Sequence, residues 1–277
     1  VDAISRFRLG WLLLVPASVE PLLQRLKDTQ TRVKGVRVVG CMADLVPAKV
    51  ISEITRMLNV PFLNSFGSTE TGLGPLTAHL IPIGEVPQDL AKRKSSICEF
   101  RLVDGDGNDV ADGEIGEGIM RGPTLFSGYW NAPKTNAEDF RDGWFHMGDL
   151  FRRTASGGFE FVGRSKYMIK SGGENIYPAE IERVLLGDSR IADAAVVRKP
   201  DSQWGEIAVA FIARNDDSLD ATAIEQICRA RIAGYKRPRE VYFIPMDEMP
   251  RSATGRIVRE VLERRLAGSD ARPVRTH

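Results

Sequence analysis

Hydroxyl and carboxylate side chains follow one another in the stretch NSFGSTETG, residues 64–72, directly after the apolar run VPFL. Gly67 permits a tight turn, Ser68 and Thr69 supply hydroxyls, and Glu70 supplies a carboxylate. Loops at the carboxyl ends of parallel strands are where α/β folds place ligand sites. A hydroxyl beside a carboxylate suits a phosphate and its magnesium ion. Read alone, the signal is weak, because most such loops are solvated turns.

A second candidate is Asp149, at the end of the stretch GWFHMGD, residues 143–149. Its carboxylate could accept hydrogen bonds from both hydroxyls of a ribose, because two adjacent donors match two acceptor oxygens. The alternative is a hairpin turn with Trp144 and Phe145 in the core. His146 has no cysteine or acidic partner at metal-ligand spacing, so we expect no zinc site here.

The stretch GRSKYMIKSGGENIYPAEIE, residues 163–182, combines basic residues, a Gly-Gly turn and the start of a helix. Gly172 and Gly173 tolerate backbone angles that other residues avoid, and Pro178 suits the first turn of a helix. Further along, PRSATGRIVR, residues 250–259, places three arginines around another glycine turn. Read alone, each stretch is also compatible with a surface turn before a helix.

The first 95 residues contain the elements that must position the first motif. Helical periodicity over 20–30 and 47–58 alternates with apolar, strand-like runs at 36–39 and 60–63. This order predicts part of a parallel α/β layer over 1–95.

Two further sections follow. Short runs broken by Asp-Gly and Gly turns predict a barrel-like β section over 96–164, which completes a first domain, 1–164. Residues 165–277 predict a small α+β domain. Its expected helices lie near 178–187, 220–233 and 257–267, and its expected strands near 194–199, 207–213 and 240–245.

Composition excludes several classes of protein. The 277 residues are 43% hydrophobic and 27% charged, an ordinary soluble composition. The net charge of +1 gives no general attraction to nucleic acid. The longest apolar stretch, LGWLLLVP, is too short to span a membrane. The three cysteines are far apart in apolar surroundings, which predicts reduced core thiols and a cytoplasmic location.

Together, the four stretches resemble core motifs of the adenylate-forming enzymes: acyl-CoA synthetases, peptide-synthetase adenylation domains and luciferases. The family pattern Tyr-Gly-x-Thr-Glu matches 66–70, and Gly-Trp-x-x-Thr-Gly-Asp matches 143–149. The long pattern Gly-Arg-x-Lys-Asp-x-Ile-Lys-x-Gly-Gly-x-Asn-Ile-x-Pro-x-Glu-Ile-Glu matches 163–182 almost throughout. Pro-Lys-Thr-x-x-Gly-Lys-Ile matches 250–257 more loosely. Four such motifs in order are highly specific, and the likeness covers essentially the whole chain.

The resemblance implies an acyl-CoA synthetase of the kind found in fatty acid metabolism. A small carboxylic acid attacks the α-phosphate of ATP, giving an acyl-adenylate and pyrophosphate, and the thiol of coenzyme A then displaces AMP. The implied cofactors and partners are therefore ATP and AMP, magnesium, coenzyme A and the acid, with a homodimer left open. Charge builds on phosphate oxygens in the first step, so the site needs fixed cations and donors there.

The resemblance also implies roles for individual residues around the nucleotide. Phe66 would pack on adenine in place of the usual tyrosine, with Gly67 beside it. Thr69 would bond a phosphate, and Glu70 would hold magnesium. Asp149 would hold the ribose together with the arginine at position 164.

Four further residues are implied in the two half-reactions. The small domain would be mobile and swing between them, with Lys166 at the hinge just after Arg164. Gly172 and Gly173 would then line the channel for the pantetheine arm. Arg256 stands where the family keeps the lysine that bridges the carboxylate and the α-phosphate.

Several residues depart from the family pattern. Tyr167 replaces an acidic residue, and Met147 replaces a threonine near the ribose. The largest departure is Arg256, because a planar guanidinium fork is aimed differently from a point ammonium. Lys236 lies too far along the chain to be an obvious substitute. This departure is expected to affect the first half-reaction more than the second.

The family's Ser/Thr/Gly-rich phosphate loop ending in Pro-Lys has no counterpart in these 277 residues. We therefore expect the C-terminal portion of a longer synthetase, inactive by itself. Two alternatives stay open. The chain could be a catalytically defective AMP-binding remnant or partner-binding module, or it could belong to an adenylation enzyme that loads a carrier protein.

Overall fold

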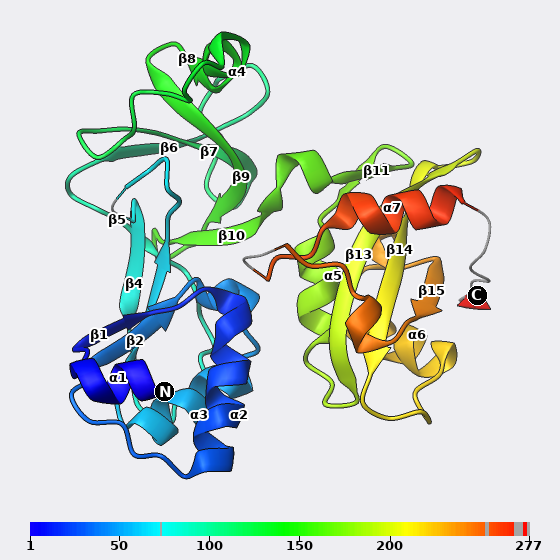
Figure 1. Ribbon diagram of the computed structural model, residues 1–277. Coiled ribbons are helices and arrows are strands. Elements are labelled where there is room, and N and C mark those ends of the chain that lie inside the picture. Colours follow the sequence, from blue (N-terminus) through cyan, green and yellow to red (C-terminus); the bar gives the residue numbers. More distant parts are fainter. Residues whose placement is uncertain (73, 253–254, 269–273, 276–277) are drawn as a thin grey trace. The chain divides into compact units, whose positions relative to one another are not determined.

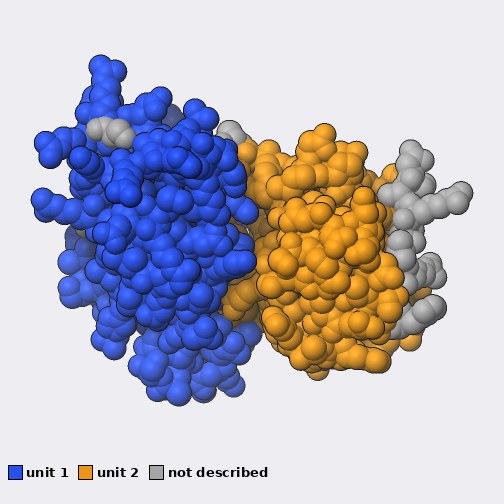
Figure 2. Space-filling model, turned by 90° about the horizontal axis from the view of Figure 1, so that it is seen from below, with its two compact units in different colours: residues 1–161 blue, residues 162–277 orange. Residues whose placement is uncertain are grey.

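The computed structural model describes residues 1–72, 74–252, 255–268 and 274–275. The chain divides into two compact units, residues 1–161 and 162–277 (Figure 2). The division falls just before the predicted domain boundary between residues 164 and 165. Each unit is described separately.

Parallel strands form the layer of unit 1 that carries the first motif (Figure 1). They are β1 (Trp11–Leu13), β2 (Val38–Cys41) and β3 (Phe62–Phe66), in that spatial order. β4 (Leu76–Ile81) and β5 (Arg93–Lys94) extend the sheet in antiparallel pairing. Because β2 and β3 are parallel, the loops after both strands start at the same edge of the sheet.

Amphipathic helices cover this sheet. The helices of this region are α1 (Asp2–Phe7), α2 (Val19–Thr29) and α3 (Ala48–Leu58), with the 3-10 turns η1 (Pro16–Ser18) and η2 (Ala43–Leu45). Apolar side chains of α2 and α3 share one buried cluster with the strands, including Leu23, Leu26, Ile51, Ile54, Val39 and Phe62. Both predicted helices are confirmed, and removal of this apolar surface from water is the main stabilising term.

The strand predicted at 60–63 begins two residues late, at Phe62. The Val60 amide instead donates to the Thr55 carbonyl at 3.2 Å and closes α3. Pro61 has no N–H to donate to a ladder. The strand predicted at 36–39 likewise starts late, at Val38.

The second sheet of unit 1 is the predicted β section. Its strands β6 (Glu99–Val103), β7 (Ile115–Arg121), β9 (Trp144–Arg153) and β10 (Phe159–Arg164) lie in the order β10-β9-β7-β6. β8 (Phe140–Arg141) pairs with β9, and α4 (Pro133–Asp139) precedes it. Phenylalanine rings fill the core next to β3, from Phe66, Phe100, Phe145, Phe151, Phe159 and Phe161. This core lies directly behind the first motif.

Unit 2 is built on a six-stranded sheet. Its strands are β11 (Ile169–Ser171), β12 (Glu174–Ile176), β13 (Ile191–Asp201), β14 (Gly205–Arg214), β15 (Glu240–Phe243) and β16 (Val274–Arg275). Its helices are α5 (Pro178–Leu185), α6 (Ala221–Arg229) and α7 (Arg259–Ala267), with the 3-10 turns η3 (Ser165–Tyr167), η4 (Gly234–Lys236) and η5 (Met246–Glu248). Every helix and strand predicted here is present, although α6 ends at Arg229 rather than near 233.

Alternating residues of β13 and β14 face two different cores. Ala194 and Val196 pack with α5 and α6, whereas Ala195 and Val197 pack with Leu262 of α7. A strand that is buried on both faces gives the continuous apolar run read as AAVV in the sequence. The central strands are therefore the rigid part of unit 2.

The predicted fold class, a partial α/β layer with a half-barrel β section and a small α+β unit, is confirmed. The prediction of core thiols is also confirmed, because all three cysteines are free and buried. Burial raises the pKa of Cys41 to about 12 and that of Cys228 to about 11. Within the described residues, no helix is both long and apolar enough to cross a membrane.

Candidate active site

The loop after β3 is folded around a buried hydroxyl that lies outside the predicted site residues. Thr71 Oγ1 accepts a hydrogen bond from the Ser68 amide at 2.8 Å and donates to the Ser68 carbonyl at 3.1 Å. Thr71 is 1% exposed, whereas Thr69 is exposed. The turn is thus fixed from inside, which leaves Thr69 at the surface.

Glu70 is held by a segment that is distant in sequence. Its Oε1 accepts a hydrogen bond from the Tyr129 hydroxyl at 3.2 Å, and its carbonyl accepts one from the Phe126 amide at 2.9 Å. Thr124 Oγ1 donates to the Thr71 carbonyl at 3.0 Å. Tyr129 therefore orients the candidate carboxylate. The only signal for it in the sequence is an aromatic, glycine-containing run, LFSGYW.

Gly72 allows this contact between the two segments. Its φ is +67°, and a Cβ there would lie 2.5 Å from the carbonyl oxygen of Thr124. Only glycine accommodates both the backbone angle and the close approach.

Phe66 ends β3, and its ring is almost fully covered. It packs edge-on to Phe151 with ring centroids 4.9 Å apart, and it stacks at 27° on Phe161. Phe66 is 5% exposed. A contact with adenine would depend on the small part of the ring that stays exposed, and it remains a prediction.

A β-bulge places Asp149. In the β7–β9 ladder Gly118 lies opposite three residues, Met147 to Asp149, which bulge out of the strand. Gly148 takes φ +70°, and its amide donates to Glu117 Oε1 at 3.0 Å. Bulges re-aim side chains and are frequent next to active sites. Asp149 is 4% exposed, so its carboxylate is held in a largely buried position.

The alternative interpretation of this motif is also borne out in part. β8 and β9 form a hairpin whose turn residues, Asp142 and Gly143, have φ values of 51° and 79°. Trp144 and Phe145 are buried. The motif therefore combines a hairpin and two core rings with the bulge that carries the candidate aspartate.

In unit 2, the predicted hinge residue lies in η3 and contacts α7. Lys166 Nζ is 3.4 Å from Glu260 Oε1, and the Tyr167 hydroxyl donates to the same oxygen at 3.3 Å. The guanidinium of Arg259 lies 4.8 Å from the centre of the Tyr167 ring. Arg164 is the residue just before η3. The acidic residue that pairs with the hinge thus comes from α7 and was not predicted.

The Gly-Gly stretch forms the tip of a β-hairpin. Ser171 pairs with Glu174, so Gly172 and Gly173 are the two turn residues, with φ values of +58° and +87°. Positive φ at both central positions is the requirement of a type I′ turn. The Gly172 amide donates to the Trp204 carbonyl at 2.8 Å, and a Cβ at Gly172 would lie 2.7 Å from the Trp204 ring. Trp204 thus covers this turn, a role that the sequence did not indicate.

The fourth motif forms a loop with its two sides paired. Arg251 and Ile257 form an isolated bridge, and the Ser252 amide donates to the Arg256 carbonyl at 2.8 Å. The Arg256 amide donates to Ser252 Oγ at 3.2 Å. The Arg256 side chain is exposed. The two residues at the tip of the motif, 253–254, lie outside the described residues.

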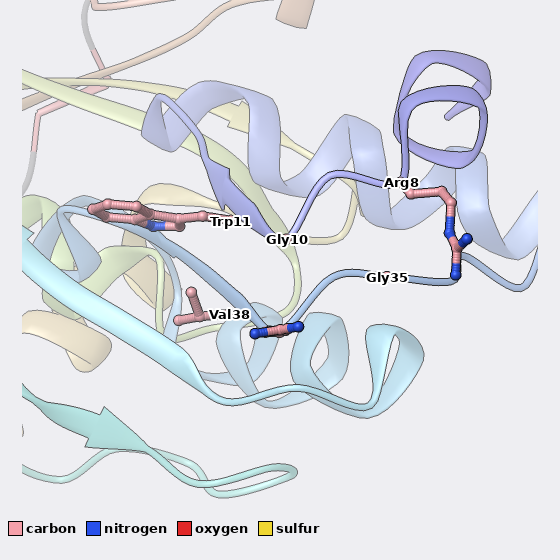
Figure 3. Close-up of a pocket in the computed structure, with 6 residues that line it drawn as sticks. Arg8, Gly10, Trp11, Gly35 and Val38 are labelled. Carbon is pink, nitrogen blue, oxygen red and sulfur yellow. The ribbon is translucent and has the colours of Figure 1, made fainter.

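One pocket of unit 1 lies away from these motifs. A shallow pocket of about 580 Å³ is lined by Arg8, Gly10, Trp11, Gly35, Arg37 and Val38 (Figure 3). These residues begin β1 and β2, so the pocket lies at the amino ends of the parallel strands. The loop after β3 starts at the opposite, carboxyl edge, where α/β folds bind ligands. We therefore assign no ligand role to this pocket.

Metal binding can be assessed from the donor residues. In the described parts of the chain, no group of three or more His, Cys, Asp or Glu side chains could hold an ion. His146 Nδ1 lies 3.0 Å from Glu117 Oε2 and 2.6 Å from Arg141 Nη2. Mg²⁺ is commonly bound by one or two carboxylates together with substrate phosphates and water. A single carboxylate such as that of Glu70 is compatible with that pattern, and its role in metal binding stays a prediction.

Comparison with known proteins agrees with this arrangement. The AMP-binding enzyme family matches residues 1–130, and the AMP-binding enzyme C-terminal domain matches residues 180–256. Indoleacetate–CoA ligase of Aromatoleum aromaticum is 38% identical over 95% of this chain and 52% of its own length. Feruloyl-CoA synthase of Amycolatopsis sp. is 34% identical over 96% of this chain and 53% of its own length.

The fold agrees as well. The o-succinylbenzoate CoA synthetase of Bacillus subtilis, solved with its acyl-adenylate intermediate, superposes with a TM-score of 0.79 at 28% identity, over 99% of this chain and 54% of that chain. The architecture and the order of the motifs define an adenylate-forming type of fold. The chain belongs to the AMP-binding enzyme family. It spans about half the length of the curated relatives that it matches.

Proposed function

We propose that the protein containing this sequence joins a carboxylic acid to coenzyme A through an acyl-adenylate, at the expense of ATP. The observation that carries the proposal is the loop after β3, which exposes Thr69 and holds the Glu70 carboxylate against Tyr129. Family membership supports the same chemistry, because relatives that match almost the whole chain are CoA ligases.

In the first step, a carboxylate oxygen bonds to the α-phosphorus and the bond to pyrophosphate breaks. Thr69 donates a hydrogen bond to a phosphate oxygen, and Arg256 places positive charge beside the α-phosphate. When bound, Mg²⁺ at Glu70 would neutralise phosphate charge. Such fixed charges and donors stabilise the charge that develops in the transition state.

In the second step, the coenzyme A thiolate bonds to the acyl carbon and AMP leaves. Asp149 and Arg164 hold the ribose. Rotation of the small domain about Lys166 takes the protein from the first half-reaction to the second. Gly172 and Gly173 then lie along the pantetheine arm, where the absence of side chains keeps the channel open. Their positive φ values favour glycine at both positions.

The test is a pair of assays on the full-length protein. A panel of carboxylic acids should support acid-dependent exchange of pyrophosphate into ATP, and the responding acid should form its CoA thioester with release of AMP. If pyrophosphate exchange occurred but the acyl group were transferred only to the thiol of a carrier protein, the acceptor would be a carrier protein and not coenzyme A. No exchange with any acid would favour a catalytically defective, AMP-binding remnant.

Residues 1–277 produced alone should give no pyrophosphate exchange with an acid that the full-length protein uses. The sequence contains no phosphate loop, so the charge on the departing pyrophosphate would be unsupported. The measurement is exchange by purified residues 1–277 beside the full-length protein at equal concentration. Comparable exchange by both proteins would show that the site in these residues is sufficient.

Gly172→Ala and Gly173→Ala should both slow thioester formation from pre-made acyl-adenylate, since each places a Cβ on a left-handed backbone at a cost of about 1–2 kcal/mol. Only Gly172→Ala should also displace Trp204, because a Cβ at Gly173 has no atom within 4 Å. The indole N–H resonance of Trp204, assigned with Trp204→Phe, reports this directly. An unshifted resonance in Gly172→Ala would mean that Trp204 does not cover the turn in solution.

A further inference from the structure

A buried carboxylate lies at the start of β13, outside all four motifs. Asp193 follows a register shift in the β13–β14 ladder, and its side chain is 8% exposed. Its Oδ1 accepts a hydrogen bond from the Ala194 amide at 2.9 Å. Burial raises the pKa of Asp193, and the charge of Arg251 acts in the opposite direction. A carboxylate this buried is stable only with its counter-ion in place.

The counter-ion links the strand to the fourth motif. One guanidinium nitrogen of Arg251, Nη2, donates to Asp193 Oδ2, and the other, Nη1, donates to the Gly255 carbonyl at 2.5 Å. Gly255 directly precedes Arg256 and has φ +78°. The planar fork of arginine suits such a double contact, because its donors are fixed relative to one another.

The Arg256 side chain has no comparable anchor. It is exposed, and in the part of the chain that the structure describes it forms no ion pair. Its backbone amide and carbonyl both bond to Ser252, and the carbonyl of the preceding residue, Gly255, accepts from Arg251. The backbone therefore fixes the Cα–Cβ direction from which the Arg256 side chain starts, and this backbone is tied to Asp193 through Arg251.

We propose that Asp193 is a positioning residue for acyl-adenylate formation, which aims Arg256 through the Arg251 fork. The inference rests on the proposed function, in which Arg256 meets the α-phosphate. β13 is suited to this task, because the next residues, Ala194 and Ala195, are 2% and 0% exposed in the two cores. A loop that is tied to a rigid strand keeps its catalytic charge in place, whereas a shift of 1 Å can slow a reaction by about 100-fold.

The test compares Asp193→Asn in two backgrounds of the full-length protein. In the parent, single-turnover adenylation should fall by about tenfold, while thioester formation from pre-made acyl-adenylate should change by less than about threefold. In Arg256→Ala, which has no charged side chain to aim, Asp193→Asn should cause no further loss. An equal loss in both backgrounds would overturn the proposal, because it would mean that Asp193 does not act through Arg256.

Glu240→Gln is the matched control. Glu240 of β15 is paired with Lys199 of β13 at 2.9 Å, and its side chain is also 8% exposed. Glu240→Gln removes a buried carboxylate without touching the fourth motif, so both half-reactions should stay near the parent rates. If Glu240→Gln reproduced the selective adenylation loss, general loosening of unit 2 would explain the data and the proposal would fail.

Amide hydrogen exchange separates this proposal from the proposed function. Asp193→Asn should speed exchange at Gly255 and Arg256 by about tenfold or more, with β14 unchanged, since local opening exposes only the released segment. Unchanged hydrogen exchange at these two amides would overturn the proposal, whatever the adenylation rate of the variant. Faster exchange in a protein that forms no adenylate from any acid would support the anchor and reject the ligase function.

Discussion

Arg256→Lys is expected to raise the rate of acyl-adenylate formation in the full-length protein by about 10- to 100-fold, because a misplaced transition-state contact costs up to about 100-fold. Thioester formation from pre-made acyl-adenylate should be nearly unchanged. The resemblance to adenylate-forming enzymes places this side chain at the α-phosphate only in the first half-reaction. The substitution should therefore change the rate of adenylation without changing the rate of thioester formation.

The physical reason is the shape of the cation. A lysine ammonium is compact and can point between a carboxylate and a phosphate oxygen, whereas a guanidinium must present a plane. The Arg256 backbone is held on both its amide and its carbonyl by Ser252, so the loop offers little freedom to correct the aim of a wider group.

Single-turnover kinetics of both half-reactions provides the measurement, with Arg256→Ala as the reference for a site without this charge. The expected order of adenylation rates is lysine, then arginine, then alanine. A lysine variant no faster than the parent would indicate a site rebuilt around arginine. Arginine and alanine at equal rates would remove position 256 from the reaction.

Lys92→Met is expected to lower the free energy of unfolding of unit 1 by about 3–5 kcal/mol, the usual cost of leaving one buried charge without its partner. Lys92 Nζ forms an ion pair with Asp44 Oδ2, and the two side chains are 0% and 1% exposed. Lys92 Nζ also donates to the Leu90 carbonyl at 3.1 Å. In the structure as described, Asp44 Oδ1 has no hydrogen-bond partner, so the lysine charge is its main compensation.

Lys92 also connects the two sheets of unit 1. Its amide donates to the Phe159 carbonyl at 2.9 Å, and the Phe159 amide donates to the Lys92 carbonyl at 2.7 Å. Its side chain meanwhile lies against Asp44, in the turn after β2. Loss of the ion pair should therefore loosen the region from which the Gly67–Gly72 loop starts.

A second pair in the same unit provides the control. Lys27 Nζ lies 2.6 Å from Glu53 Oε2, but the side chains are 44% and 30% exposed. Exposed pairs contribute about 0–1 kcal/mol, so Lys27→Met should have little effect. Replacement of both buried partners, Asp44→Leu with Lys92→Met, should recover most of the loss, because an apolar pair leaves no charge unpaired.

Urea unfolding, with hydrogen exchange at β2 and β3 amides, reports unit 1 separately from unit 2. If Lys92→Met cost no more than Lys27→Met, the buried pair would contribute little to unit 1. If the double variant were no more stable than Lys92→Met, the loss would come from packing rather than from charge.

The local features of this protein were readable from its sequence. The spacing of Leu22, Leu23 and Leu26 predicted α2, and the apolar run AAVV predicted the strand near 194–199, which lies within β13, because neighbouring residues alone set a 3.6-residue or two-residue period. Gly172 and Gly173 predicted a turn for a similarly local reason, which the hairpin confirms. The first residues of the strands were predicted less accurately. The Val60 amide, for example, donates to the end of α3 and not to a strand.

The tertiary structure alone decided which side chains hold the candidate site. Tyr129 and Glu70 are 59 residues apart, Arg251 and Asp193 are 58 apart, and Lys92 and Asp44 are 48 apart. No local periodicity links such positions. The sequence determined the residue types, the turns and the order of the motifs, because these depend on short-range sterics and hydrogen bonding. The partners that orient Glu70 and Arg256 were decided only by packing of the whole chain, since burial brings distant residues together and requires each buried charge to be compensated.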